Sequence, residues 1–536
     1  MNVRYSPLIS AKRYSFCLYR FVTMAKIEIV AGSFAGWGSK IKQDLKMEKF
    51  VTILGVSFIA LWTLLVLILL VRKITGCQFI RGLSYVYDGP NIIQKAYNQA
   101  SGSRFVVATP NNNHILVSSP QLIEEVFNHS HPQLSLHAVA KEMLHPKYTM
   151  RGFEWQEKRG VEGTGFVRAL RSLLTAHLPD MLPRLKHIIE QGLQSEFECY
   201  KTPEGSSHIP ISKTVQNLIS TANCFVFFGE GISQDAKFVN AALTFPRDVM
   251  IAAEFLRMVP EVCAPLVARL ATGNHKASRY MFKVLAPIVQ RRMHLRSTGQ
   301  EKQKDAPVDC MQWLIDTSPR NNSWTVERMV GEIMAVWFGS VHQLAISSTF
   351  AIEDLCLFPE YVGPLREEAS QATVSANGLP LLDSFLKESA RCSSVDAITC
   401  RRKTLTPFTF SDGFTVPVGD WLCIPQKAML HDPRLYPDPE TFKGFRFVIE
   451  KSDNDVTSNH ENKGHFTDAS VDWPMWGLGK IACPGRFYAA CVMKLIMVEI
   501  LKTYDCALLD KTRARAASWR SSVIPYGNTI IVFRRR

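Results

Sequence analysis

A single cysteine at the end of a glycine-containing loop is the residue of this sequence best suited to chemistry. The loop reads Trp473-Pro-Met-Trp-Gly-Leu-Gly-Lys-Ile-Ala-Cys483-Pro-Gly-Arg, and an apolar helix is predicted directly after it. Pro484 stands where a first helical residue is expected. The positive end of that helix and the free N–H groups of Gly485 and Arg486 would then face Cys483, and both stabilise a thiolate.

A thiolate in such a loop is either a metal ligand or a nucleophile. No second cysteine at C-x-x-C spacing and no nearby histidine completes a zinc site. Gly477 and Gly479 allow the chain to lie flat against a planar group, which suits a haem whose iron takes one axial thiolate. The alternative is that Cys483 is a small core residue ahead of an apolar helix.

The wider pattern of the loop supports the haem interpretation. The run Trp476-x-x-Gly479-x-x-x-Cys483-x-Gly485 resembles the cysteine loop of the cytochrome P-450 family, the haem-thiolate monooxygenases, with tryptophan where the family usually has phenylalanine. The resemblance implies a haem b whose iron is bound by Cys483, with Trp476, Gly479 and Gly485 against the cofactor.

Partners for the haem propionates are less regular in this sequence. Two residues before the cysteine the family usually has arginine or histidine, and here stands Ile481, so that Lys480 is the candidate replacement. The resemblance also implies an arginine on an early helix, for which we select Arg171. A further one is expected on a central strand, where Arg401 and Arg402 are the candidates.

Three charged residues ahead of the cysteine match another mark of the family. Glu388 and Arg391 are three apart on a predicted helix and therefore share one face, and Arg446 follows them. A Glu-x-x-Arg pair alone carries little information, because many surface helices contain one. Its position before Arg446 and Cys483 resembles the family's buried salt-bridged cluster behind the haem loop.

The longest helical pattern runs from Thr325 to about Phe358. At a rise of about 1.5 Å per residue, such a helix would cross the whole domain. Its middle resembles the family's oxygen-activating helix, where a small residue makes room for dioxygen and an acid followed by threonine relays protons. Here His342 and Gln343 occupy those two positions and are the catalytic candidates. An amide can donate a hydrogen bond but cannot pass on a proton as a hydroxyl does, so the relay is assigned to His342 and a water or substrate hydroxyl.

The residues that we expect to line the substrate pocket are mainly apolar, and they favour a lipophilic substrate such as a terpenoid. They are Trp337, Phe338, Val395, Ile398 and Ile524. The overall pattern is similar to filamentous-fungal members that tailor natural products. By resemblance, the reaction inserts one oxygen atom of dioxygen, with electrons from NADPH delivered by a reductase. Two alternatives remain open: a haem-thiolate isomerase or dehydratase without net oxidation, and a non-catalytic membrane haem-binding protein.

Length and composition favour one large domain. The chain has 536 residues without an internal repeat or low-complexity linker, and the resemblance from residue 72 to the end implies a mainly α fold with small β sheets (α+β). Its 13 cysteines are an odd number without paired spacing, which favours reduced thiols facing the cytosol. The net charge of +14 is not gathered in a nucleic-acid-binding module, so a membrane surface or an acidic redox partner is expected instead.

A membrane anchor is predicted near the N-terminus. No charge interrupts the apolar run from Phe50 to Val71. A helix of this length spans a hydrocarbon core of roughly 30 Å. Residues 1–46 carry eight Lys or Arg against two acids and would by themselves hold this end in the cytosol. Because the family normally starts just before its anchor, we interpret residues 1–46 as an upstream extension or a targeting segment. The expected location is the endoplasmic reticulum membrane, single-pass, with the domain of residues 72–536 in the cytosol.

Overall fold

Helices make up most of the structure, a computed structural model that describes residues 63, 78–100, 102–127, 132–153, 165–299, 307–319, 324–371, 378–448 and 464–536. The chain from Gln78 to Arg536 forms one compact unit. The extension 1–46 and, apart from Thr63, the predicted anchor 50–71 lie outside the described residues. The expectation of a mainly α fold with small sheets is confirmed for the described part of the chain.

The largest sheet has five strands in the order β1-β2-β8-β5-β3. Its first two strands form the hairpin predicted from the sequence, with Phe105 opposite Leu116. The strand β2 then pairs in parallel with β8, and β5 pairs with β8 across a register shift. The bounds are β1 Phe105–Ala108, β2 Asn113–Leu116, β3 Leu134–Ser135, β5 Thr399–Thr404 and β8 Trp421–Ile424.

Three smaller sheets complete the β structure of the described residues. One is three-stranded in the order β4-β12-β9, and the others are the hairpins β6-β7 and β10-β11. The bounds are β4 Ser207–Pro210, β6 Phe408–Thr409, β7 Thr415–Val416, β9 Tyr504–Leu508, β10 Ala516–Trp519, β11 Ser522–Pro525 and β12 Ile530–Arg535.

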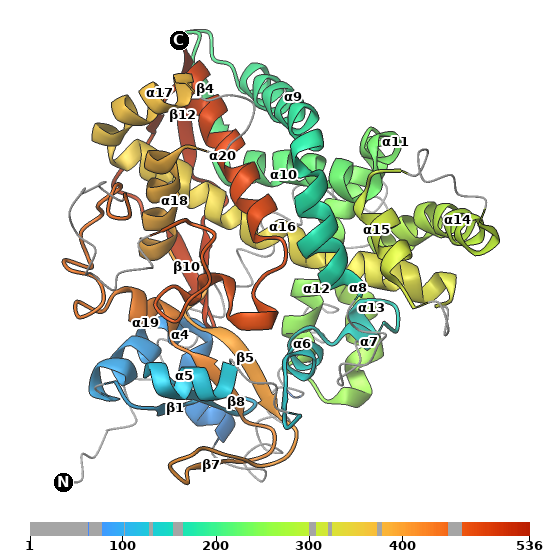
Figure 1. Cartoon of the computed structure of the whole chain (residues 1–536), viewed down its shortest axis with the longest axis vertical. Helices are drawn as coiled ribbons and strands as arrows, with labels where there is room; N and C mark the ends of the chain where they lie inside the picture. Colours follow the sequence, from blue (N-terminus) through green and yellow to red (C-terminus); the bar gives the residue numbers. More distant parts are fainter. Residues whose placement is uncertain are drawn as a thin grey trace, which may run out of the picture. The chain divides into compact units, whose positions relative to one another are not determined.

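Among the helices whose bounds the structure describes before the central one, the first is α4, which lies beside the five-stranded sheet (Figure 1). Their bounds are α4 Gln78–Ala100, α5 Pro120–Phe127, α6 Leu136–Leu144, α7 Pro146–Thr149, α8 Gly165–Arg168, η1 Ala169–Leu174, α9 Thr175–Cys199, α10 Ile211–Phe228, α11 Glu230–Ser233, α12 Ala236–Leu256, η2 Glu261–Cys263, α13 Ala264–Ala271, α14 Lys276–Thr298 and α15 Cys310–Thr317. Pro179 and Pro183, which the sequence pattern placed at interruptions, lie inside α9 without ending it.

The central helix α16 spans Val326–Leu357, as the sequence predicts. It begins at the N-cap Thr325, whose hydroxyl accepts a hydrogen bond from the N–H of Arg328 at 3.1 Å. This bond satisfies one otherwise free donor of the first turn. The helix packs against α10, α12, α14 and α18, and Figure 1 shows it crossing the middle of the unit. Most of its side chains are therefore buried, and its few exposed positions call for an explanation.

The chain after α16 carries the charged cluster and the cysteine loop. The helix α20 begins directly after the loop and packs against α9, α16 and α17. The remaining bounds are η3 Pro359–Tyr361, α17 Val362–Gln371, α18 Pro380–Cys392, α19 Gln426–Leu430, η4 Pro474–Trp476, η5 Gly479–Ile481 and α20 Arg486–Thr503.

Candidate functional site: the cysteine loop and the open face of the central helix

The cysteine loop is held in one conformation by backbone and indole hydrogen bonds. The N–H of Cys483 donates to the carbonyl of Trp476 at 2.6 Å. The indole N–H groups of Trp473 and Trp476 both donate to the carbonyl of Phe466, at 3.2 and 2.6 Å. Gly477 has a φ of 79°, and a Cβ there would meet the carbonyl oxygen of Ile481 at 3.4 Å. This turn therefore requires glycine.

The electrostatics of Cys483 combine burial with nearby positive charge. Burial raises the pKa of its thiol, while the N–H groups of Gly485 and Arg486 and the guanidinium groups of Arg486 and Arg171 act in the opposite direction. The predicted N–H contacts are therefore present, but they do not outweigh burial. A cation bound to the sulfur would favour the thiolate form of Cys483 over the thiol.

The start of the following helix differs from the sequence prediction. The helix α20 begins at Arg486 with Gly485 as its N-cap, so Pro484 lies in the preceding turn and not at the first helical position. The physical reason is that the sulfur of Cys483 accepts hydrogen bonds from the backbone N–H groups of both Gly485 and Arg486. This arrangement places the N-cap two residues after the cysteine.

One face of α16 opens into space in the middle of an otherwise buried helix. Gly339 and Gln343 are both exposed, and they stand one turn apart on the same side of the helix. A Cβ built on Gly339 would meet no atom within 4 Å. Such an open, glycine-lined face in the centre of the unit leaves room for a bound group or molecule.

A buried hydrogen-bond chain ties the cysteine loop to this face. The hydroxyl of Tyr488, on α20, donates to the side-chain oxygen of Asn223 on α10 at 2.7 Å. The amide nitrogen of Asn223 in turn donates to the carbonyl of Ser340, next to Gly339, at 3.0 Å. Because Tyr488 and Asn223 are buried, these two hydrogen bonds fix α20 against the middle of α16. The sequence pattern did not single out either residue.

Comparison with known protein families identifies the family to which this chain belongs. The model of the family described as "Cytochrome P450" matches residues 80–529. This chain belongs to the cytochrome P450 family. The P450 relatives that it resembles include cytochrome P450 monooxygenase 151 of Postia placenta, 28% identical over 470 residues that cover 86% of this chain and 91% of the relative. Ent-kaurene oxidase P450-4 of Gibberella fujikuroi is also 28% identical, over 87% of this chain and 91% of the relative.

A solved P450 structure has the same fold. The retinoic acid-bound cyanobacterial CYP120A1 superposes with a TM-score of 0.62 over 85% of this chain and 96% of its own, at 18% sequence identity. The family match and the monooxygenase relatives identify the protein as a cytochrome P450 monooxygenase, and membership of the family implies a haem-thiolate cofactor.

The residues of the site fit the P450 haem. Cys483 offers a thiol surrounded by positive partners, and the open face at Gly339 leaves space where a side chain would intrude. The haem, when bound, supplies one-electron and dioxygen chemistry, which a thiolate ligand tunes toward O–O cleavage. The protein's part is to hold the thiolate, exclude water and position substrate and proton donors.

The candidate propionate partners lie in different surroundings. Arg171 donates to the carbonyl of Ala482 at 3.2 Å and thus contacts the cysteine loop itself. Arg401 forms an ion pair with Asp396, and Arg402 lies over the ring of Phe127 at 5.5 Å from its centroid, so both stay candidates. Lys480 belongs to η5, but its side chain lies outside the described residues.

The predicted charged cluster is assembled in the structure. Arg391 donates to both carboxylate oxygens of Glu388 at 2.8 Å, and Arg446 donates to one of them at 3.0 Å. Two parallel bonds between a guanidinium and a carboxylate are among the strongest pairings of these groups. Both Glu388 and Arg391 have 0% relative exposure. Arg391 also donates to the carbonyls of Leu430 and Pro439, so the cluster joins α18 to the segment that follows α19.

His342 faces helix α12 in this structure. Its imidazole is hydrogen-bonded to the backbone of Pro246, and because proline has no N–H, the acceptor must be the carbonyl. The Nε2 atom is buried without a hydrogen-bond partner among the described residues. Burial lowers the pKa of His342, and the ring is neutral. The relay role assigned to His342 from the sequence therefore stays a prediction, with Nε2 as the atom that would accept and return a proton.

Pro246 also explains the position of Trp337. Without an N–H, Pro246 leaves the carbonyl of Ala242 free. The indole N–H of Trp337 donates to that carbonyl at 2.9 Å. Trp337 packs edge-on against Phe227 in the core. The structure therefore does not bring Trp337 into the open space, because its side chain joins α16 to α10 and α12.

The other predicted pocket residues separate into two groups. Val395 lies beside the strand that carries Ile524, because the N–H of the neighbouring Val523 donates to the carbonyl of Val395 at 3.0 Å. The side chain of Ile524 is exposed. Ile398 instead packs in the core beside Tyr85, against the five-stranded sheet. Phe338 is half-buried on α16, next to Gly339.

Replacing His342 and Gln343 of α16 one at a time should distinguish their roles. We expect Gln343→Thr to keep haem content and to raise the fraction of NADPH that yields product by up to about tenfold, because a hydroxyl can pass on a proton. His342→Ala should lower the midpoint of thermal unfolding, since a hydrogen bond worth about 1 kcal/mol to α12 is lost. The measurements are NADPH, product and hydrogen peroxide balances, with thermal unfolding alongside. Peroxide release from His342→Ala at unchanged thermal stability would instead show that His342 relays protons.

Proposed function

We propose that this P450 oxidises a lipophilic, terpenoid-like intermediate of fungal secondary metabolism. The observation that carries the proposal is the open face of α16, where Gly339 and Gln343 stand beside the half-buried Phe338. An apolar surface with one amide favours a hydrocarbon skeleton over a charged substrate. The similarity to an ent-kaurene oxidase, a protein named for a terpenoid substrate, supports the same class.

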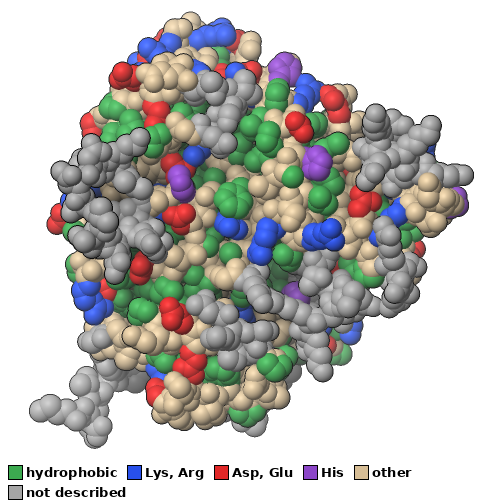
Figure 2. Space-filling model, viewed as in Figure 1, with side chains coloured by type: hydrophobic (Ala, Val, Ile, Leu, Met, Phe, Trp, Pro, Cys, Tyr) green, Lys and Arg blue, Asp and Glu red, His purple; other side chains and the backbone are tan. Residues whose placement is uncertain are grey.

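The proposed reaction uses haem b, dioxygen and electrons from NADPH that a separate reductase delivers. Figure 2 shows Lys and Arg side chains gathered near the centre of one face, the face on which α9 and α20 lie in Figure 1. Arg171 and Arg486 donate to the carbonyls of Ala482 and Cys483 and thus add positive charge at the cysteine loop. Positive charge close to the haem site favours docking of an acidic redox partner.

The proposed location is the endoplasmic reticulum membrane, with the large domain in the cytosol. Besides the predicted anchor at 50–71, the segment after α12 presents a row of exposed apolar side chains. Val262, Leu266 and Leu270 are 87%, 63% and 72% exposed and follow one another along η2 and α13. Their spacing of four residues places them on one side of a helix, and such a row favours contact with a lipid surface. Co-sedimentation of the full chain with microsomal membranes, resistant to high salt, is the expected result.

One experiment tests the proposed activity. The purified holoprotein should give the strongly red-shifted Soret band of a thiolate-ligated haem when reduced under carbon monoxide. With reductase, NADPH and a diterpene hydrocarbon, it should then consume NADPH and incorporate one atom of ¹⁸O from labelled dioxygen. An intact spectrum with an isomerised, oxygen-free product and no NADPH consumption would overturn the proposal in favour of isomerisation.

A further inference from the structure

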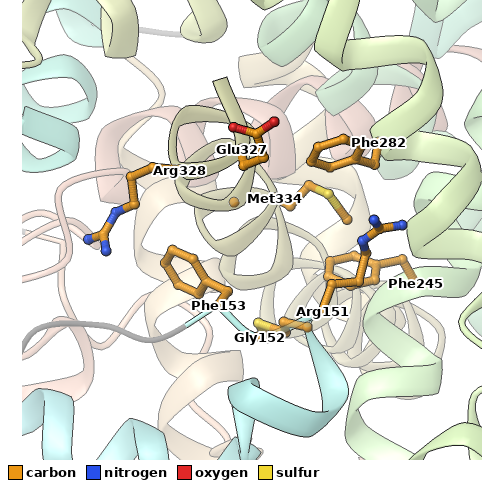
Figure 3. Close-up of a pocket in the computed structure, with 10 residues that line it drawn as sticks. Arg151, Gly152, Phe153, Phe245, Phe282, Glu327, Arg328 and Met334 are labelled. Atoms are coloured by element: carbon orange, nitrogen blue, oxygen red, sulfur yellow. The ribbon is translucent and has the colours of Figure 1, made fainter. Parts of the chain in front are cut away.

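A second cavity lies between α7, α12, α14 and the first turns of α16. It has a volume of about 240 Å³ and is partly open. Some residues of its wall precede Gly339 on the same helix. Met334 is five residues before Gly339, and Gly331 is eight residues before Gly339. Eight residues correspond to about 12 Å along a helix. Figure 3 shows the side chains around this space. Its lining consists of Met150, Arg151, Gly152, Phe153, Phe245, Phe282, Glu327, Arg328, Gly331 and Met334.

The floor of this cavity is built by a close contact between Phe153 and α16. A Cβ at Gly331 would stand only 2.7 Å from Cδ2 of Phe153, so the ring lies directly on the helix backbone. Phe245 and Met334 are buried, and they complete an apolar interior with Phe282. A hydrocarbon chain placed there would be removed from water on several sides.

Arg151 is held at the edge of the cavity by an unusual backbone conformation. Its φ is 55° and that of Gly152 is 79°, so the two residues form a left-handed pair. This conformation is unfavourable for a residue other than glycine. The guanidinium lies over the ring of Phe282, 4.6 Å from its centroid. A cation–π contact uses the face of the guanidinium and leaves its N–H donors at the edge available.

Among the described residues, the charges around the cavity leave Arg151 as the available cation. Arg328 is paired with Glu332, one turn further along α16. Among the described residues, no carboxylate forms an ion pair with Arg151. Glu327 is the one acid of the lining; it is exposed, and Figure 3 shows it on the wall opposite Arg151.

We propose that this cavity is a second ligand site that binds a lipophilic carboxylate of medium chain length. The carboxylate is held by the N–H donors of Arg151, as arginine prefers, and the chain lies between Phe153, Phe282 and Met334. The volume is below the roughly 300 to 1,000 Å³ of complete small-molecule sites, which suits a chain of about ten carbons better than a polycyclic skeleton. The lining of the cavity includes neither Gly339 nor Gln343, and the proposed binding does not depend on the proposed reaction.

Binding can be measured with the haem site blocked. The holoprotein is saturated with a tight-binding azole, and decanoate, decanol and decyltrimethylammonium are titrated into it by calorimetry. Decanoate is expected to bind at least about fivefold more tightly than decanol, because a charge-assisted hydrogen bond is stronger than a neutral one. The cationic analogue should bind least. Equal affinity for all three, or no binding of decanoate, overturns the proposal.

Variants at the two charged residues should act in opposite directions. Arg151→Gln should weaken decanoate binding about tenfold and leave decanol unchanged, and Arg151→Lys should recover part of the affinity. Glu327→Gln should strengthen decanoate binding about twofold by removing a like charge at the edge. If both charge-removing variants change the affinity in the same direction, the carboxylate is not bound by Arg151.

A helix variant tests the apolar part of the site. Gly331→Ala should push the ring of Phe153 into the cavity and weaken decanoate and decanol alike, by about tenfold. Gly363→Ala is the matched control, because Gly363 also lies in a helix and a Cβ there meets no atom within 4 Å. Unchanged affinity for both ligands in Gly331→Ala places the chain elsewhere and contradicts the site.

Discussion

Replacing Cys483 with alanine should abolish both the red-shifted carbon monoxide band and turnover. Alanine has no atom that can bind the haem iron, so the axial thiolate is lost. The change removes one atom from a loop that is pinned by Trp473, Trp476 and Phe466, so the fold should persist. Loss of the ligand without loss of the fold is therefore the expected outcome.

A second cysteine provides the control for this variant. Cys491 lies on α20, two turns after the loop, and burial raises the pKa of its thiol to about 12, so it is a neutral core group. Cys491→Ala should keep the band and most of the activity, at a cost of about 1 kcal/mol or less for the lost sulfur. Reduced spectra, haem content and circular dichroism of both variants make the comparison. A red-shifted band that survives in Cys483→Ala would exclude this residue as the ligand.

Replacing Glu388 with alanine should give mostly misfolded protein without haem. Arg391 would lose the only carboxylate within ion-pair distance among the described residues, while it remains fully buried. Breaking a buried pair by removing one partner costs roughly 3 to 5 kcal/mol, a large share of the roughly 5 to 15 kcal/mol by which a typical domain is stable. The second arginine of the cluster, Arg446, loses the same carboxylate and adds to the effect.

An exposed ion pair offers the control for Glu388. Lys186 and Glu190 face each other one turn apart on α9, and their side chains are 42% and 37% exposed. Glu190→Ala should therefore cost no more than about 0.5 kcal/mol. Soluble yield, haem content and thermal unfolding of the two variants should differ accordingly. Well-folded holoprotein from Glu388→Ala would show that the cluster does not stabilise the fold.

The same cluster predicts how stability depends on pH. Burial alone would raise the pKa of Glu388, but the hydrogen bonds and charges of Arg391 and Arg446 lower it below its ordinary value. A lowered pKa means that this contribution is fully present above the unfolded pKa of about 4.5 and is lost as pH falls through the folded pKa. We expect Glu388→Gln to reduce the acid dependence of the unfolding free energy in that range, measured by denaturant titration at a series of pH values.

Local patterns were sufficient to predict several parts of the site from the sequence. The cysteine with its glycines, the Glu388–Arg391 spacing and the capped helix that begins at Thr325 each depend on residues close together in the chain. Periodicity and turn chemistry also predicted the hairpin of β1 and β2. Spacing of this kind directly reflects the period of a helix or a turn, so it can be read without the fold.

The roles of single polar groups were decided by tertiary structure. Asn223 is 265 residues from Tyr488 and 117 from Ser340, and nothing in its own helix distinguishes it from a solvent-facing asparagine. Trp337 and His342 looked like site residues because they stand beside Gly339 and Gln343. The missing N–H of Pro246 on another helix instead directs Trp337 to α12, and the carbonyl of Pro246 holds His342 there. Which group a side chain meets depends on helices packed from distant parts of the chain, and a buried polar atom takes whatever partner that packing leaves free.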